Sequence, residues 1–370
     1  MIFNFDFFDA MFLGLIFMCC IQLFYSFFFF LRLALHKNKE ATNLKKAPVS
    51  VVICAKNEEL NLIHNLPFIL NQNYPDFEIV VVNHGSTDQT AKVLSDYQKT
   101  HNNLKVLYFE NDKPGKKDPL TFGINNASNE YLILTDADCR PASDIWIRKF
   151  SSDFAINKQI ILGYGPHNKS KGVLNYFIRF DTAIIGTTYL SFALSRFGYM
   201  GVGRNIGYTK TLFASVNGFE SHKEIASGDD DLFIQQAINK SNFQIQTDSD
   251  TYCYSNTCLS LKSWISQKKR HQSTSSKYKV INKALLGIYS CSLILMWFSF
   301  VSLFVEGEHR ELSLEIFCFV LAVKWGIQGS AMRKIKEGHF IWVFPFLELA
   351  QNIAMTLIYC LGGKTKKNKW

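Results

Sequence analysis

The sequence lacks several patterns that define common classes of protein. Its nine cysteines form no C-x-x-C pair and no spacing typical of a metal site, so we expect reduced thiols that pack as small hydrophobic residues. No internal repeat or low-complexity linker is evident. No basic stripe is interleaved with aromatic residues, so the chain is not expected to bind nucleic acid. These absences exclude a cysteine-based metal module, a repeat array and a nucleic-acid-binding protein.

Long hydrophobic runs, in contrast, are present at both ends of the chain. Residues 8–35 are almost wholly apolar, and the run exceeds the roughly 20 residues that are needed to cross a bilayer. Basic residues follow this run, beginning with His36 and Lys37, whereas a signal peptide carries its charge in front. We therefore expect an uncleaved transmembrane anchor. By the positive-inside rule, the domain that follows lies on the cytoplasmic side of the inner (cytoplasmic) membrane.

The C-terminal part, residues 284–361, contains three further apolar segments: 284–305, 312–332 and 340–361. The last segment also carries four residues that are unusual in a span: Pro345, Glu348, Gln351 and Asn352. Two interpretations of this segment therefore stay open: a third span of the C-terminal part, or a re-entrant or interfacial helix. The formal net charge is +9, and most of the excess basic residues lie beside the apolar segments. This pattern predicts anionic membrane lipids as a partner.

Between these regions, residues 48–275 alternate between strand and helix patterns. Strands are expected at 48–55, 77–82 and 104–109, with helices at 60–70 and 89–99. This alternation predicts parallel strands joined by right-handed crossovers, an α/β fold suited to nucleotide binding.

Polar residues follow each of these strands, at the edge of the sheet where α/β folds bind ligands. The candidates for contact with a nucleotide are Ala55, Lys56, Asn57 and Glu58 after the first strand, Asn83, His84 and Ser86 after the second, and Lys113 and Lys116 after the third. The two lysines flank Gly115 in a basic loop that can cover a diphosphate. A merely solvated loop is the alternative.

A fourth strand, residues 131–134, ends in two carboxylates, Asp136 and Asp138. Hard oxygen ligands at a strand end predict a Mg²⁺ or Mn²⁺ ion that chelates a phosphate. Aspartate is also common in solvated turns, so a turn is the competing interpretation.

The order of these features resembles the family 2 glycosyltransferases, whose catalytic domain has the GT-A fold, a Rossmann-like mixed sheet. The resemblance is carried by CAKNE, VVNHGSTD, KPGKKDPLTFGINNA and YLILTDADCRP, and later by GVGRNIGY, ASGDDDLF and QKKRH. It covers residues 48–275 and implies a nucleotide-diphosphate sugar donor. It also implies that Asp138 binds the metal, with Asp136 nearer the ribose or sharing the metal.

Two positions depart from the pattern of the family. Many members carry an Asp pair where this chain has Asn83 and His84, so the identity of the nucleotide base is open between UDP and GDP donors. Asp118 and Pro119 stand where apolar residues are expected, so the backbone of that loop is expected to differ.

The later motifs supply candidate catalytic residues. Three consecutive carboxylates, Asp229 to Asp231, precede a helix, and the resemblance aligns Asp230 with the catalytic base. Gln267 and Arg270 share one face of a predicted helix, from which an arginine can bind a leaving diphosphate through two hydrogen bonds. A basic helix bound to lipid is the alternative there. A further long helix, residues 172–197, is expected along the membrane surface or in the core.

The sequence thus predicts a membrane-anchored inverting glycosyltransferase that transfers a sugar to a lipid-linked or cell-envelope glycan acceptor. Three alternatives stay open: a processive polysaccharide synthase, a polyprenyl-phosphate glycosyltransferase, and a membrane module that binds nucleotide sugars without catalysis. The oligomeric state is not predicted.

Overall fold

The computed structural model describes residues 6–38, 47–110, 115–152, 154, 158–225, 227–307 and 309–361. The chain divides into two compact units. Among the described residues, a helical unit contains 6–36, 183–195 and 279–361, and an α/β unit contains those between 37 and 182 and between 196 and 278.

The α/β unit is built on a seven-stranded sheet with the strand order β3-β2-β1-β4-β7-β6-β8. Its strands are β1 (Val49–Ala55), β2 (Phe77–Asn83), β3 (Leu104–Tyr108), β4 (Tyr131–Leu134), β6 (Ile160–Leu162), β7 (Ile206–Thr209) and β8 (Phe243–Ile245). The first four strands are parallel, while β7 runs antiparallel to both β4 and β6. The expected α/β fold with a mixed sheet is confirmed, and the four strands that the sequence predicts most strongly form its parallel half.

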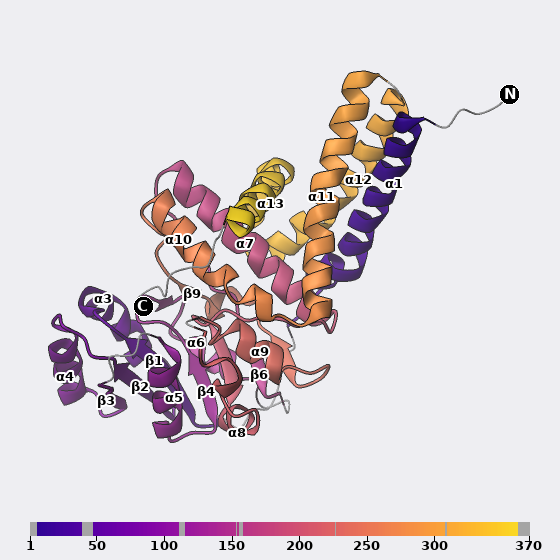
Figure 1. The fold of residues 1–370 in the computed structure, drawn as a ribbon. Helices are drawn as coiled ribbons and strands as arrows, with labels where there is room; N and C mark the ends of the chain where they lie inside the picture. Colours follow the sequence, from indigo (N-terminus) through magenta and orange to yellow (C-terminus); the bar gives the residue numbers. More distant parts are fainter. Residues whose placement is uncertain are drawn as a thin grey trace. The chain divides into compact units, whose positions relative to one another are not determined.

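Helices cover both faces of this sheet (Figure 1). They are α3 (Glu59–Leu70), α4 (Thr90–Thr100), α5 (Lys117–Asn126), α6 (Trp146–Ser151), α8 (Lys210–Ser215) and α9 (Asp231–Ala237). A further helix of this unit, α10 (Leu261–Gln272), does not lie on the sheet. A second, two-stranded sheet pairs β5 (Arg140–Pro141) with β9 (Cys253–Tyr254).

Side chains along a strand point alternately to the two faces of the sheet, so their contacts show which face α3, α6 and α5 cover. Val51 and Ile53 of β1 belong to one hydrophobic core with Leu66 of α3 and Trp146 of α6. On the opposite face, α5 approaches the sheet so closely that a Cβ on Gly123 would lie 2.8 Å from Val82 Cγ2. The sheet is therefore a middle layer that is buried on both sides, as expected for its continuous apolar strands.

The parallel pairing brings three strand ends to one edge of the sheet. Ala55, the last residue of β1, pairs with Asn83, the last residue of β2, and Val52 pairs with Leu134 of β4. The loops that follow β1, β2 and β4 therefore begin beside one another, and these loops carry the predicted nucleotide and metal residues.

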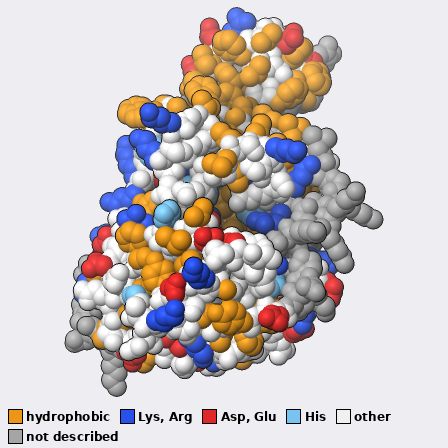
Figure 2. Space-filling view, turned by 90° about the vertical axis from the view of Figure 1, so that its left-hand side faces the viewer, with side chains coloured by type: hydrophobic (Ala, Val, Ile, Leu, Met, Phe, Trp, Pro, Cys, Tyr) orange, Lys and Arg blue, Asp and Glu red, His pale blue; other side chains and the backbone are white. Residues whose placement is uncertain are grey.

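The helical unit contains four segments that are long and apolar enough to cross a membrane: Phe7–Ala34, Val280–Glu306, Arg310–Lys334 and Gly338–Cys360. They correspond to α1 (Phe7–Tyr25) continued by a π-helical turn and α2 (Leu31–Ala34), α11 (Val280–Glu306), α12 (Arg310–Lys334), and α13 (Phe344–Leu361) with the 3-10 turn before it. Hydrophobic side chains cover the outer surface of this unit at the top of Figure 2, and charged side chains gather at its end. These features support the predicted association with a membrane.

Polar residues inside the helical unit face one another. Lys324 Nζ of α12 lies 2.8 Å from Glu348 Oε1 of α13 and 2.7 Å from Gln22 Oε1 of α1, and all three residues are buried. Of the polar residues that make the last segment unusual, Glu348 therefore has a partner on each of two other helices, α11 and α12, while Asn352 donates within α13 to the Glu348 carbonyl at 2.9 Å. Figure 1 shows α13 at an angle to α1, α11 and α12, so three and four crossings both remain predictions.

The long helix expected at 172–197 is present as α7 (Val173–Leu194). Its first part belongs to the α/β unit and the part from Ala183 belongs to the helical unit. It is not among the helices that meet the criteria for a span in the described part of the chain.

Candidate active site

The loops after β1 and β2 are bonded to each other. Asn57, with a left-handed φ of +57°, donates its backbone N–H to Ser86 Oγ at 3.0 Å. Its side-chain Oδ1 accepts from the N–H of Thr87 at 2.8 Å. The N–H of Glu58 donates to Thr90 Oγ1 at 2.9 Å. Asn57, Glu58 and Ser86, all predicted from the sequence, therefore shape one rigid edge of the site.

Asn83 and His84, which stand where many family members carry an Asp pair, are buried beneath this edge. Asn83 Oδ1 accepts from the backbone N–H of Ser86 at 3.3 Å, so its side chain supports the turn. The backbone N–H of His84 donates to the Ala55 carbonyl at 2.9 Å, and the imidazole packs edge-to-face against Phe109, with ring centroids 5.7 Å apart. Asn83 is 4% exposed and His84 is fully buried. Their predicted role in base binding is untested.

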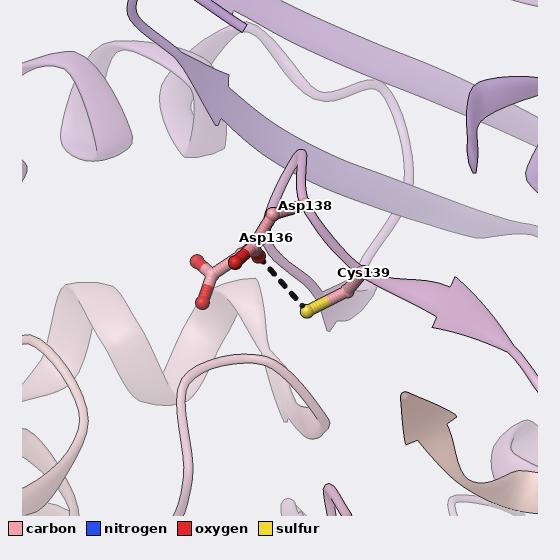
Figure 3. A group of neighbouring side chains, drawn as sticks. All are labelled: Asp136, Asp138 and Cys139. Atoms are coloured by element: carbon pink, nitrogen blue, oxygen red, sulfur yellow. Dashed lines mark hydrogen bonds between the residues drawn. The ribbon is translucent and has the colours of Figure 1, made fainter. Parts of the chain in front are cut away.

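The carboxylates after β4 form the best candidate for a metal site among the described residues. Ligand atoms of Asp136, Asp138 and Cys139 all lie within 4.8 Å of one another (Figure 3). The Cys139 thiol donates a hydrogen bond to Asp138 Oδ1, with a distance of 3.2 Å between the two atoms. Burial raises the pKa of this thiol, so in the protein without a metal it is a neutral hydrogen-bond donor. Two carboxylates with a neutral neighbour suit a hard ion such as Mg²⁺ or Mn²⁺.

The two carboxylates differ in their electrostatic surroundings. Burial raises the pKa of Asp138, and the charge of Asp136 raises it further. Burial has the same effect on Asp136, but the charges of Lys116, Arg204 and Arg270 together outweigh it and hold the pKa of Asp136 below its ordinary value. Asp136 is therefore the more readily ionised carboxylate of the pair.

Lys116 connects the carboxylates after β4 to the later acidic motif. Its Nζ lies 2.5 Å from Asp136 Oδ1 and 3.3 Å from Asp229 Oδ2. The neighbouring Lys117 is used differently, because its Nζ donates to the carbonyl oxygens of His222 and Ile225. The predicted loop over the diphosphate thus has one lysine at the carboxylates and one that holds the backbone. Lys113 lies outside the described residues.

The acidic motif places Asp230 at the start of α9. Asp230 Oδ2 accepts from the N–H of Gly203 at 2.9 Å, and Oδ1 accepts from the N–H of Asp231 at 2.8 Å. Burial, reinforced by the charges of Asp229 and Asp231, raises the pKa of Asp230 to about 7. A carboxylate with such a pKa can take up a proton at neutral pH, as a general base must.

The loop before β7 contacts both the segment with the carboxylates after β4 and the acidic motif before α9. The sequence pattern alone did not indicate this. The carbonyl of Arg204 accepts from Thr135 Oγ1 at 2.9 Å, one residue before Asp136. The Arg204 guanidinium donates to the Gly165 carbonyl at 2.9 Å, and its charge lowers the pKa of Asp136. The motif GVGRN indicates this loop, but the sequence assigns no role to Arg204, because its partners lie far from it in the chain.

Helix α10 supplies the remaining predicted residues. The charge of Arg270 lowers the pKa of Asp136, as expected if the guanidinium faces the site. Gln267 Oε1 accepts a weak hydrogen bond from the Cys258 thiol at 3.4 Å. Lys268, on another face, is buried in an ion pair with Asp181 of α7. The structure therefore separates Arg270 from Lys268 as the helical spacing predicts.

Comparisons with known proteins give the family of this domain. Residues 50–216 match the model of glycosyl transferase family 2. Over 90 residues the chain is 36% identical to a poly-beta-1,6-N-acetyl-D-glucosamine synthase of Staphylococcus epidermidis, a match that covers 24% of this chain and 21% of that protein. Over 141 residues it is 30% identical to an uncharacterized glycosyltransferase of Haemophilus influenzae, covering 38% of this chain and 41% of the relative. The matches thus span less than half the length of these relatives.

A solved structure is similar over nearly the whole chain. It is the mannosyltransferase PcManGT of Pyrobaculum calidifontis, in complex with GDP-Man and Mn²⁺. The TM-score is 0.56 at 15% sequence identity, with 95% of this chain and 99% of that chain covered. At this identity the likeness concerns the fold. The family match shows that residues 50–216 form a domain of glycosyl transferase family 2, and the likeness to the solved structure supports its GT-A fold.

Proposed function

We propose that the protein is a membrane-anchored inverting glycosyltransferase that uses a nucleotide-diphosphate sugar. The observation that carries this proposal is a contact that connects the carboxylates after β4 with the acidic motif before α9. Lys116 contacts both Asp136, at the predicted donor side, and Asp229, the neighbour of Asp230. The carboxylates proposed to bind the donor and the residue proposed as the general base therefore belong to one continuous polar cluster.

The donor side is assigned to the residues after β4 and to two cations. Asp138 would hold Mg²⁺ or Mn²⁺, with Asp136 sharing it or contacting the ribose, and the ion would offset negative charge on the diphosphate. Lys116 and Arg270 carry the positive charges that can stabilise the departing nucleoside diphosphate. The edge formed by Asn57, Glu58 and Ser86 is proposed to position the nucleotide.

The acceptor side is assigned to Asp230. Its carboxylate takes the proton of the acceptor hydroxyl as that oxygen forms a bond to the anomeric carbon. The bond from that carbon to the diphosphate oxygen breaks in the same step, and the electron pair leaves with the nucleotide. A single displacement from the opposite face inverts the configuration of the anomeric carbon. The N–H groups of Gly203 and Asp231 fix the carboxylate in place before reaction.

The donor and acceptor are proposed by chemical class. The solved neighbour contains GDP-Man, and the relative from Staphylococcus epidermidis is named for a polymer of N-acetylglucosamine, so both GDP- and UDP-sugars are candidates. The four apolar segments favour an acceptor at a membrane, either a lipid-linked sugar or a cell-envelope glycan. We infer that the α/β unit faces the cytoplasm, where nucleotide sugars are made.

A processive polysaccharide synthase is the second candidate, because the Staphylococcus epidermidis relative is named as a synthase of poly-beta-1,6-N-acetyl-D-glucosamine. Product length distinguishes the two candidates. A single added sugar supports transfer to one acceptor, whereas a ladder of products supports the synthase.

The test of the proposed function is a screen of UDP- and GDP-sugars with the full-length protein in detergent and Mn²⁺. A donor that binds only the folded protein raises its thermal midpoint. We expect one donor class to raise the midpoint only with the metal present, and the same donor to support sugar transfer or slow hydrolysis. A protein that no nucleotide sugar stabilises, and that turns over none of them, would contradict the proposal.

A further inference from the structure

The three consecutive carboxylates of the acidic motif have three different sets of partners. Asp229 Oδ2 lies 3.3 Å from Lys116 Nζ, on the donor side. Asp230 is held by the backbone of Gly203 and Asp231. Asp231 turns away from both, and its partners come from the segment that follows α10. The motif therefore joins three parts of the α/β unit.

Asp231 is buried and has several hydrogen-bond donors. Its Oδ2 accepts from the Tyr278 hydroxyl at 2.6 Å and from the Thr274 hydroxyl, while Oδ1 accepts from the N–H of Leu232 at 2.7 Å. Thr274 is fully buried and Asp231 is 7% exposed. Burying a carboxylate is unfavourable unless such donors compensate it, so this contact imposes a specific geometry.

The partners of Asp231 are fixed relative to Arg270. The N–H of Ser273 donates to the carbonyl oxygens of Lys269 and Arg270, each at 3.2 Å, and Thr274 follows directly. The N–H of Lys277 donates to the carbonyl of Thr274 at 2.9 Å, which continues the turn toward Tyr278. Asp231, which follows the proposed base directly, is thus bonded to the turn after the proposed diphosphate-binding arginine.

We propose that Asp231 is a positioning residue for sugar transfer. This inference rests on the proposed function. The contacts of Asp231 with Thr274 and Tyr278 set the distance between Asp230 and Arg270. These two residues act on opposite bonds of the anomeric carbon, one on the bond that forms and one on the bond that breaks. A small error in their separation slows the reaction without removing either group.

Helix capping does not account for this arrangement. The N-cap of α9 is Asp230, whose side chain already accepts from the N–H of Asp231. The two hydroxyl contacts of Asp231 reach beyond α9 to residues more than forty positions later. They therefore orient one element against another.

The test compares Thr274→Val with Thr274→Ser and adds Tyr278→Phe, in the full-length protein with the donor found by the screen. Valine has the shape of threonine without its hydroxyl, and serine keeps the hydroxyl. We expect kcat to fall by about ten- to a hundredfold in Thr274→Val and Tyr278→Phe, because misplacement of about 1 Å can reduce a rate by that much. We expect the KM for the donor to stay within about twofold, and Thr274→Ser to recover most of kcat.

Three outcomes would overturn the inference. One is wild-type kcat in both Thr274→Val and Tyr278→Phe. Another is a fall in kcat that always comes with weaker donor binding and a lower thermal midpoint, because that combination indicates a structural role alone. The third is a Thr274→Ser protein as slow as Thr274→Val. A failure of the proposed function looks different, because the wild-type protein then transfers no sugar from any donor and the comparison has no reference rate.

Discussion

The Lys116 ammonium lies 2.5 Å from Asp136 Oδ1, so a side chain at the start of α5 neutralises a carboxylate at the end of β4. The same ammonium contacts Asp229 at 3.3 Å. Without a cation at this point, several carboxylates would face one another in a half-buried cluster. Lys116 therefore stabilises the protein in the absence of donor, at the position where the proposed metal and diphosphate would bring new charges.

The first prediction concerns Lys116→Met. Removing a cation that contacts Asp136 leaves the carboxylates more attractive to a divalent ion, because unit charges about 4 Å apart interact by about 4 kcal/mol at a protein surface before solvent and salt reduce this. We expect Mn²⁺ to bind the donor-free variant about tenfold more tightly, and the nucleoside diphosphate to bind less tightly. Isothermal titration calorimetry measures both affinities.

Lys92→Met is the matched control for this prediction, because Lys92 is an exposed residue of α4 outside the cluster. The control is expected to leave both affinities unchanged. Equal Mn²⁺ affinity in Lys116→Met and the wild-type protein would show that Lys116 does not influence the carboxylates after β4.

The second prediction concerns Asp230→Asn. An amide cannot take up the proton of the acceptor hydroxyl, so the transfer rate is expected to fall by about a thousandfold, within the range typical of a lost general base. The carboxylates after β4 are unchanged, so donor affinity is expected to stay within about threefold of the wild-type value. Full transfer activity in this variant would remove Asp230 from the mechanism.

The third prediction concerns pH. The pKa of Asp230 is raised from its ordinary 3.8 to about 7, by burial first and by Asp229 and Asp231 second. Only the deprotonated carboxylate acts as a base. The rate of transfer is therefore expected to rise about tenfold per pH unit below 7 and to level off above it. A pH–rate profile checks this, and a profile that is flat between pH 5 and pH 8 would be inconsistent with Asp230 as the base.

The fourth prediction concerns the ion pair of the helical unit. Replacing Lys324 alone by Met leaves Glu348 buried without its cation, a change that typically costs about 3–5 kcal/mol. Replacing both residues by Met removes the uncompensated charge, so the double variant is expected to be more stable than Lys324→Met. Thermal midpoints in detergent measure this order. A double variant less stable than Lys324→Met would show that the pair is not coupled.

Much of the fold could be predicted from the sequence, because local patterns were strong. β1, β2, β3 and β4 are short apolar runs that end in polar residues, and their parallel order follows from the helices between them. The antiparallel β7 was missed. It has four residues, Ile206–Thr209, and its place between β4 and β6 depends on contacts that no local pattern encodes.

The site was predicted in part, for the same reason. Asp136, Asp138 and Asp230 stand in recognisable motifs, so their residue types already indicate their chemistry. The contact of Lys116 with Asp229 and that of Asp231 with Tyr278 join residues distant in sequence, so only the folded chain reveals them. Cys139 illustrates the same limit. Its position next to Asp138 was visible in the sequence, but its hydrogen bond to that carboxylate was not.

Sugar transfer by a single displacement is the central claim, and the anomeric configuration of the product tests it most directly. The measurement uses the donor identified by the screen and an acceptor that receives one sugar, followed by NMR of the anomeric proton. The account predicts that an α-linked donor gives a β-linked product. A product that retains the α configuration would contradict a single displacement assisted by Asp230.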